Sequence, residues 1–458
     1  MTPVTAGWLG DRLARHAERC GVPGAAAAII HRGRCVEAAT GKLNLATGLD
    51  ATADSLFQIG SITKAFTATL VLQLVERGRV GLDDPLRRHL PWFRVASREA
   101  TESVTIAQLL SHTSGIDGDW FPDTGTGPDC IEKYARGCAD LGQIHAPGDG
   151  ISYTNAAPIL LAAMLQEITG KGWDALLRER ILDPLRAEHM TTDFAQLPSH
   201  RVAAGHLPDP QTKQLAVSTH QFLPRGMGPT GATLHAGALD LARFGEAFLH
   251  GGVAHTGARL LSESTIEQAR KRVASWRTAP WLGVRMGLGW MLHDWSGRAV
   301  FGHDGTTIGQ SAFLRIAPHA DLVVTLLCNG GLAKNLYYGL FREVFADLAD
   351  TALPRAPQPI DAKRFDRTRA IGAYQNKFGK AEVFVEGDAL KLRTTPRELA
   401  HVLAAEEWPL VPIAEEACRL ENPALEMPEI IVFHRFDERG ARYASLNYRD
   451  LARLGDGR

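Results

Sequence analysis

The sequence predicts an α+β domain followed by a small all-β domain. Two groups of short apolar strands, separated by segments with helical apolar spacing, indicate one sheet flanked by helices. A stretch with prolines at 354, 357 and 359 then interrupts the pattern. Period-two alternation follows it, which is typical of strands. With 458 residues the chain is long enough for such domains. We expect boundaries at residues 1–350, 351–361 (linker) and 362–458.

The first domain begins with helical spacing and a hairpin, and ends with a run of strands. Strands at both ends and helices between them favour a single antiparallel sheet that both ends of the domain share. The helices are expected over residues 8–19, 61–77, 104–111, 156–169, 234–249, 262–272 and 336–348. The strands are expected over residues 24–30, 34–40, 287–293, 299–302, 311–316 and 322–328. In the second domain, strands are expected over residues 381–385, 389–393, 430–434 and 443–448.

The composition excludes several classes of function. Fifty basic residues against 51 acidic ones leave no electrostatic footprint for nucleic acid or an anionic membrane. No apolar run approaches the roughly 18 residues that span a bilayer, and the N-terminus lacks the pattern of an export signal. Six scattered cysteines without a CxxC pair predict reduced thiols. We therefore expect a cytoplasmic protein that contacts neither nucleic acid nor membrane.

No motif indicates a metal or a cofactor. The sequence contains no HExxH and no paired-ligand spacing of the kind that zinc sites use. It also lacks a P-loop and a strand-borne GxGxxG. We therefore expect a protein that works with its own side chains.

Ser61 and Lys64 lie at the start of the long apolar helix predicted over residues 61–77. Residues three apart share one helix face, so the lysine amine can reach the serine hydroxyl. A serine needs such a base to act as a nucleophile, and burial can lower a lysine pKa enough to supply one. The N–H groups of a helix start also favour an oxyanion beside the serine. The alternative is a capping serine with a solvated lysine.

Tyr153 and Asn155 stand two residues apart in a tight loop directly before the helix predicted at 156–169. A tyrosine can transfer a proton, and an asparagine amide can orient either the lysine or a substrate carbonyl. The same Tyr-x-Asn triplet recurs at Tyr374, so it is not specific alone. The alternative for Tyr153 is a ring that packs on the core.

His303, Gly305 and Thr306 lie at the junction of two predicted strands late in the first domain. A glycine there allows a ligand to approach the backbone closely. The next N–H, that of Thr306, could be a second oxyanion donor. His-x-Gly recurs in this chain, but only His303 lies within the late run of strands.

In this order, Ser61-x-x-Lys64, Tyr153-x-Asn155 and His303-x-Gly305 resemble the three motifs of the serine β-lactamase and D,D-peptidase superfamily. The tyrosine in the middle motif is similar to the class C branch, and the resemblance covers about residues 8–350. It implies a β-lactamase/transpeptidase-like domain without a cofactor. It implies Ser61 as nucleophile and Lys64 as general base, with Tyr153 and Asn155 for proton transfer and orientation. The N–H groups of Ser61 and Thr306 would form the oxyanion hole.

The third motif departs from the penicillin-directed members, which carry a lysine where this chain has His303. A histidine is largely neutral near pH 7, so it offers no fixed cation for a carboxylate. The resemblance therefore does not imply efficient β-lactam turnover.

A cytoplasmic member with a C-terminal β domain resembles the stand-alone penicillin-binding-protein-type thioesterases. These cyclise a nonribosomal peptide head to tail, and their β domain is lipocalin-like and borders the active site. The resemblance implies a peptidyl thioester or ester substrate, often ending in a D-residue, and a peptidyl carrier protein as a partner. It implies substrate binding by Gly305 and by Arg449, the counterpart of a C-terminal arginine in that group. The loop with Trp120 could enclose the substrate.

Two other functions remain open. The first is a cytoplasmic serine hydrolase, an esterase or a D-aminopeptidase or D-amino-acid amidase, in which water accepts the acyl group. The second is a non-catalytic binding protein on the same fold. A cyclic product separates the cyclase from the hydrolase, and covalent labelling of Ser61 separates both enzymes from the binding protein. Arg449 can also be a solvated arginine at a strand end.

Overall fold

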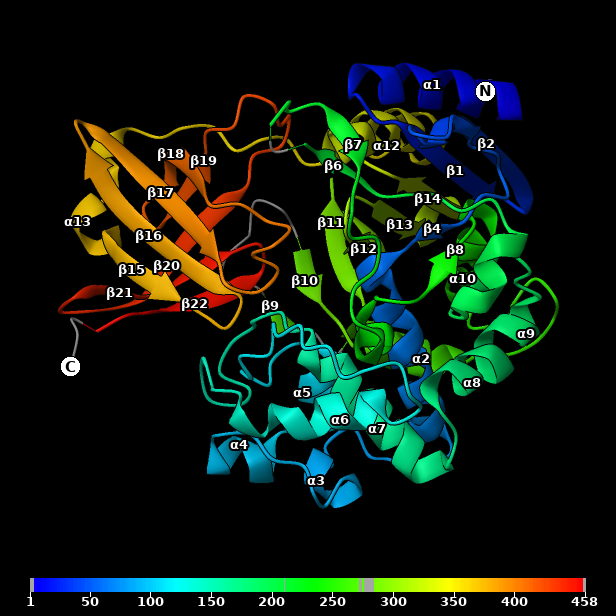
Figure 1. Cartoon of the computed structure of the whole chain (residues 1–458), viewed down its shortest axis with the longest axis horizontal. Coiled ribbons are helices and arrows are strands. Elements are labelled where there is room, and N and C mark those ends of the chain that lie inside the picture. Colours follow the sequence, from blue (N-terminus) through cyan, green and yellow to red (C-terminus); the bar gives the residue numbers. More distant parts are fainter. Residues whose placement is uncertain (1–3, 210, 272–273, 276–283, 456–458) are drawn as a thin grey trace.

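The computed structural model describes residues 4–209, 211–271, 274–275 and 284–455. A nine-stranded antiparallel sheet lies at the centre of the first domain, in the order β3-β2-β1-β14-β13-β12-β11-β10-β9 (Figure 1). The early strands join the late ones where β1 pairs with β14. The strands are β1 (Gly24–His31), β2 (Arg34–Asn44), β3 (Leu49–Asp50), β9 (Ala274–Ser275), β10 (Val284–Met286), β11 (Met291–Trp295), β12 (Arg298–Thr306), β13 (Ser311–Ala317) and β14 (Leu322–Cys328). This confirms the α+β prediction.

Both faces of the sheet are covered, which explains the continuous apolar run of β1. Ala26 and Ile30 belong to the core that includes α2 (Thr63–Glu76) and α10 (Ala238–Leu249). Ala25, Ala27 and Ile29 alternate with them and pack with α1 (Ala6–Arg19) and α12 (Ala333–Ala349) on the opposite face. A strand buried on both faces reads as uniformly apolar. The sheet therefore forms the middle layer of three.

A helical region lies below the sheet in Figure 1 and is built around two buried helices. Helix α2 begins at Thr63, shortly after Ser61. Helix α7 (Ala156–Thr169) begins directly after Asn155. The smaller helices are α3 (Leu86–His89), α4 (Arg98–Ser103), α5 (Ile106–Leu110), α6 (Cys130–Gly137), α8 (Trp173–Leu177), α9 (Asp183–Leu185) and α11 (Glu263–Lys271). Short strands complete the domain: β4 (Phe57–Gln58), β5 (Met190–Thr191), β6 (His206–Pro208), β7 (Leu215–Val217) and β8 (His235–Ala236). No helix among the described residues is long and apolar enough to cross a membrane.

The second domain is a closed barrel of eight antiparallel strands in chain order. Closure comes from the pairing of the first strand with the last, Tyr374 opposite Arg453. Alternate side chains such as Leu392 and Phe433 fill its core. The strands are β15 (Gly372–Gln375), β16 (Gly379–Glu386), β17 (Ala389–Pro396), β18 (Glu406–Ala414), β19 (Ala417–Leu420), β20 (Ile430–Asp437), β21 (Gly440–Leu446) and β22 (Arg449–Arg453), with helix α13 (Arg367–Ala370) before them. The lipocalin-like barrel predicted for this domain is confirmed.

Three local predictions were wrong. The strand expected at 287–293 begins only at Met291 as β11, and residues 287–290 form a turn after β10, because Gly289 has a positive φ of 81° and faces Ala68 of α2. The helix expected at 234–249 begins only at Ala238, after β8. His303, Gly305 and Thr306 do not lie at a junction, because β12 continues to Thr306.

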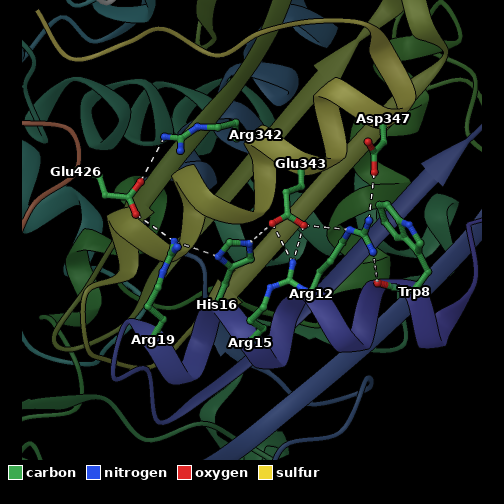
Figure 2. Close-up of polar contacts among 9 residues, drawn as sticks. All are labelled: Trp8, Arg12, Arg15, His16, Arg19, Arg342, Glu343, Asp347 and Glu426. Atoms are coloured by element: carbon green, nitrogen blue, oxygen red, sulfur yellow. Dashed lines mark hydrogen bonds and ion pairs between the residues drawn. The ribbon is translucent and has the colours of Figure 1, made fainter.

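An ionic network joins α1 to α12 and extends to the barrel (Figure 2). Glu343 of α12 accepts hydrogen bonds from Arg15 at 2.7 Å and His16 at 2.9 Å, and Arg12 lies 3.1 Å away. Since Arg19 can only donate to His16 Nδ1, the proton of a neutral His16 lies on Nε2 and points to Glu343. Arg19 also contacts Glu426 of the barrel at 3.0 Å. The network therefore attaches the outer helices to each other and to the second domain.

We predict that Glu343→Gln lowers the free energy of unfolding of the first domain by about 1–2 kcal/mol, because Arg15 and His16 lose a charged acceptor and Arg12 loses its ion pair. Urea unfolding followed by tryptophan fluorescence measures the loss. Glu267→Gln is the control, since Glu267 forms an exposed pair with Lys271 on α11 and should cost less than about 0.5 kcal/mol. Equal losses in both variants would contradict a structural role for the network.

Candidate active site

Ser61 lies in a 3-10 turn, Gly60–Ile62, that leads directly into α2 at Thr63. The turn packs against the end of β12: a Cβ on Gly60 would lie 2.6 Å from the amide nitrogen of Thr306, and its φ is 50°. Only glycine fits this conformation and contact without strain. The packing brings the N–H groups of Ser61 and Thr306 onto neighbouring segments, as an oxyanion hole requires.

Gly305 completes this contact. A Cβ there would lie 1.8 Å from the carbonyl oxygen of Ile59 and 3.0 Å from the nitrogen of Ser61. The sequence suggested that the glycine admits a ligand. In the structure the backbone that approaches it belongs to the nucleophile turn of the same chain.

Lys64 projects from the first turn of α2 and is 3% exposed. Its amine lies 2.8 Å from Ser61 Oγ, 2.9 Å from Asn155 Oδ1 and 2.9 Å from the carbonyl oxygen of Thr230. Burial lowers the Lys64 pKa well below its ordinary value, although Asp119 opposes the change. A neutral amine has two hydrogens and one lone pair. The two carbonyl-type oxygens take the hydrogens, and the lone pair is left for the Ser61 hydroxyl.

Tyr153 is 6% exposed and lies beside the same pair. Its ring stacks on His112 with centroids 4.2 Å apart, and Lys64 Nζ lies 4.9 Å from the ring centroid. Burial raises the pKa of the Tyr153 hydroxyl, and hydrogen bonding with Ser61 partly opposes this rise. The hydroxyl is therefore protonated at neutral pH and can donate a proton beside Ser61.

His303 is 1% exposed on β12, and its ring lies 6.4 Å from that of Tyr153. Nδ1 lies 2.6 Å from the carbonyl oxygen of Asp304, so Nδ1 carries the proton and Nε2 is an acceptor. Burial, with Lys64 nearby, lowers the pKa of His303 to about 4. The His303 ring of the third motif is therefore neutral at pH 7.

Arg449 reaches this site from the barrel. It forms an ion pair with Asp119, and its guanidinium lies 4.9 Å from the centre of the Tyr153 ring. The arginine is therefore not the solvated strand-end residue that was the alternative. Trp120 behaves differently, since its ring packs on Tyr134 of α6 at 5.3 Å. The substrate-binding role of Trp120 stays a prediction.

Sequence reasoning missed two residues. Asp119 accepts hydrogen bonds from the Asn155 backbone at 3.1 Å and from its side-chain amide at 2.8 Å. Thr230 binds Lys64 through its carbonyl and donates its hydroxyl to Asn155 Oδ1 at 2.8 Å. An acidic residue in the loop with Trp120 was a usable signal for Asp119, whereas nothing in the Gly/Pro-rich stretch marks Thr230.

The structure thus brings together most of the predicted site. The residues that converge are Ser61, Lys64, Tyr153, Asn155, His303, Gly305, Thr306 and Arg449. No three His, Cys, Asp or Glu side chains within the described ranges are placed to hold a metal ion. The arrangement can deprotonate a serine and stabilise an oxyanion, which are the requirements of acyl transfer.

We predict that Gly305→Ala destabilises the first domain by at least about 2 kcal/mol, because the new methyl group forces β12 away from the nucleophile turn. Thermal and urea unfolding measure the loss. Gly142→Ala is the control: its Cβ would meet nothing within 4 Å, and the change should stay within about 0.5 kcal/mol. A stable Gly305→Ala protein would show that the backbone contact is not tight.

Several known proteins are similar to this chain over most of its length. The Beta-lactamase family profile matches residues 10–336. Penicillin-binding protein 4 of Amycolatopsis lactamdurans is 40% identical over 361 residues, which cover 78% of this chain and 94% of that protein. The crystal structure of SurE with D-Leu has a TM-score of 0.74 at 26% identity and covers 98% of this chain and 99% of that chain.

The D-amino acid amidase from Ochrobactrum anthropi SV3, complexed with L-phenylalanine amide, shares the fold with a TM-score of 0.63 at 22% identity. It covers 74% of this chain and 98% of its own. The likeness to SurE therefore extends over both domains, and the likeness to the amidase over about three quarters of the chain. By its profile match and its 40% identical relative, the chain belongs to the Beta-lactamase family, as the order of its three motifs predicted.

Proposed function

We propose that the protein is a serine acyltransferase that forms an acyl-Ser61 intermediate with a peptide. The N-terminal amine of that peptide then attacks the ester and closes the ring. The contact of 2.8 Å between Ser61 Oγ and the buried Lys64 amine carries the proposal. A binding protein needs no base beside a serine. Burial lowers the Lys64 pKa, and a lysine with a lowered pKa can accept the serine proton, as acyl transfer requires.

In the first step Lys64 accepts the Ser61 proton as Oγ attacks the carbonyl carbon of the acyl donor. The N–H groups of Ser61 and Thr306 stabilise the oxyanion of the tetrahedral intermediate. When the intermediate collapses, the bond to the leaving thiolate or alkoxide breaks. The proton held by Lys64 reaches that leaving group, either directly or through the Tyr153 hydroxyl. The acyl chain remains as an ester on Ser61.

In the second step an amine attacks the ester carbonyl and gives its proton to Lys64. Collapse releases Ser61 Oγ, which recovers that proton, so the enzyme returns to its starting state. If the amine is the peptide's own N-terminus, the product is a macrocycle. Intramolecular attack is favoured when the site holds the two ends together and excludes water.

The barrel supports the choice of cyclisation over hydrolysis. It contacts the loop around Trp120, where the Phe121 backbone donates to Glu398 at 3.0 Å and its ring meets Phe378 at 6.1 Å. We propose that the loop and the barrel together enclose one side of the site and so limit the access of water. The structure of SurE with D-Leu, similar over both domains, supports an acyl donor that ends in a D-residue.

The neutral His303 supports a substrate without a carboxylate at the third motif. We therefore propose a peptidyl thioester or ester as the acyl donor, delivered by a peptidyl carrier protein. Trp120 and Arg449 are proposed to bind the peptide beside Gly305. Hydrolysis by the same residues, as in an esterase or a D-amino-acid amidase, is the competing outcome.

We predict an acyl adduct on Ser61 when the protein is incubated with a peptidyl thioester that ends in a D-residue. Intact-protein mass spectrometry detects the adduct, and the product should be lighter than the linear acid by one water. Ser61→Ala removes both signals. Linear acid as the main product would identify a hydrolase, and no adduct with this substrate or a p-nitrophenyl ester would refute the catalytic assignment.

A further inference from the structure

Asp119 lies between the catalytic side chains and the barrel. It is 3% exposed, and each of its carboxylate oxygens has a different partner. Oδ1 accepts from the backbone and the side-chain amide of Asn155. Oδ2 pairs with Arg449 at the start of β22. One carboxylate thus joins the second catalytic motif to the other domain across 330 residues of sequence.

The chemistry of Asp119 determines how Asn155 is oriented. A carboxylate only accepts hydrogen bonds, so the NH2 group of the Asn155 amide has to face Asp119. The amide oxygen then points the other way, where it accepts from Lys64 Nζ at 2.9 Å and from Thr230 Oγ1 at 2.8 Å. A flipped amide would present two hydrogens to the lysine amine. The orientation that binds Lys64 therefore depends on Asp119.

The barrel holds Arg449 in place through a strained turn. Asn447 and Tyr448 both have positive φ, 49° and 66°, which is uncommon for a bulky residue such as tyrosine. The carbonyl of Tyr448 accepts from the Tyr153 backbone at 2.9 Å, and the Asp450 backbone donates to Ser152 Oγ at 3.1 Å. These contacts fix the chain on both sides of Arg449.

We propose that Asp119 is a positioning residue for acylation of Ser61. Held by Arg449 of the docked barrel, it orients the Asn155 amide against the Lys64 amine, so that the lysine is aligned only when the two domains are joined. The inference rests on the proposed function, in which Lys64 is the general base. It adds a role for the barrel in the chemical step, besides enclosure of the substrate.

The same pair of charges acts on Lys64 in opposite directions. Burial is the main cause of its lowered pKa, Asp119 opposes that change and Arg449 adds to it. The other groups that face Lys64 are uncharged near neutral pH. Burial lowers the pKa of His303 to about 4 and that of His112 well below its ordinary value, and it raises that of Tyr153. Changes in the Asp119–Arg449 pair should therefore appear in the titration of Lys64.

We predict that Asp119→Asn slows covalent labelling of Ser61 by a fluorophosphonate at least ten-fold, because the Asn155 amide loses its fixed orientation.

Labelling rises with pH as Lys64 becomes neutral. Its midpoint should move down by about one pH unit, since the ammonium form loses an attractive charge. Arg449→Gln should move the midpoint up, since a repulsive charge is lost. The double variant should return towards the wild-type midpoint. Intact-protein mass spectrometry against pH measures these rates.

Asp117→Asn is the matched control. Asp117 lies two residues away and also contacts the barrel, accepting from the Lys377 backbone at 2.8 Å, but it is not bonded to Asn155. The pH midpoint of Ser61 labelling in Asp117→Asn should equal that of the wild type. Near-ultraviolet circular dichroism checks that each variant is folded. If Asp119→Asn does not fold, the Arg449→Gln midpoint decides the test.

The outcomes separate this inference from the proposed function. Unlabelled wild-type protein would refute Ser61 as nucleophile and the inference with it. A labelled wild type with an unshifted midpoint in Arg449→Gln would overturn the inference alone. So would an equal shift in Asp117→Asn.

Discussion

The burial of one lysine amine is the constraint on which the rest of the site depends. A buried amine is costly unless its polar contacts are all made. Lys64 meets this requirement with Ser61, Asn155 and the Thr230 carbonyl, which come from three segments far apart in sequence. The helical region must therefore bring the start of α2, the loop before α7 and the Gly/Pro-rich stretch ending at Thr230 to one point. The same burial that imposes this geometry also makes the amine a usable base.

What the sequence could predict follows from how local each feature is. Ser61 and Lys64 are one helical turn apart, so their contact follows from spacing. The strands of the second domain follow from period-two alternation, whereas their closure into a lipocalin-like barrel was implied only by the family resemblance. Asp119 could not be found in this way, because its partners Asn155 and Arg449 lie 36 and 330 residues away. Local spacing carries no information about such pairs.

Errors in the predicted elements have the same origin. The residues at 287–290 read as the start of a strand, but Gly289 has positive φ and lies against Ala68 of α2, so the strand begins only at Met291. That contact is set by tertiary packing, and it turns the chain. Trp120, in the same loop as Asp119, was predicted to contact the substrate, but its ring packs on Tyr134 of α6. Ring size is a signal for packing as much as for substrate binding.

The balance of charges argues for a neutral acyl donor. Among the described residues at the site, His303 is neutral, Arg449 is paired with Asp119, and Lys64 has a pKa lowered by burial. A substrate carboxylate would have to compete with Asp119 for the arginine, and desolvation would add to its cost. A peptidyl ester or thioester brings no such charge to the reacting carbonyl. Two features therefore favour a neutral peptidyl ester or thioester: a histidine in place of the third-motif lysine, and the Asp119–Arg449 pair.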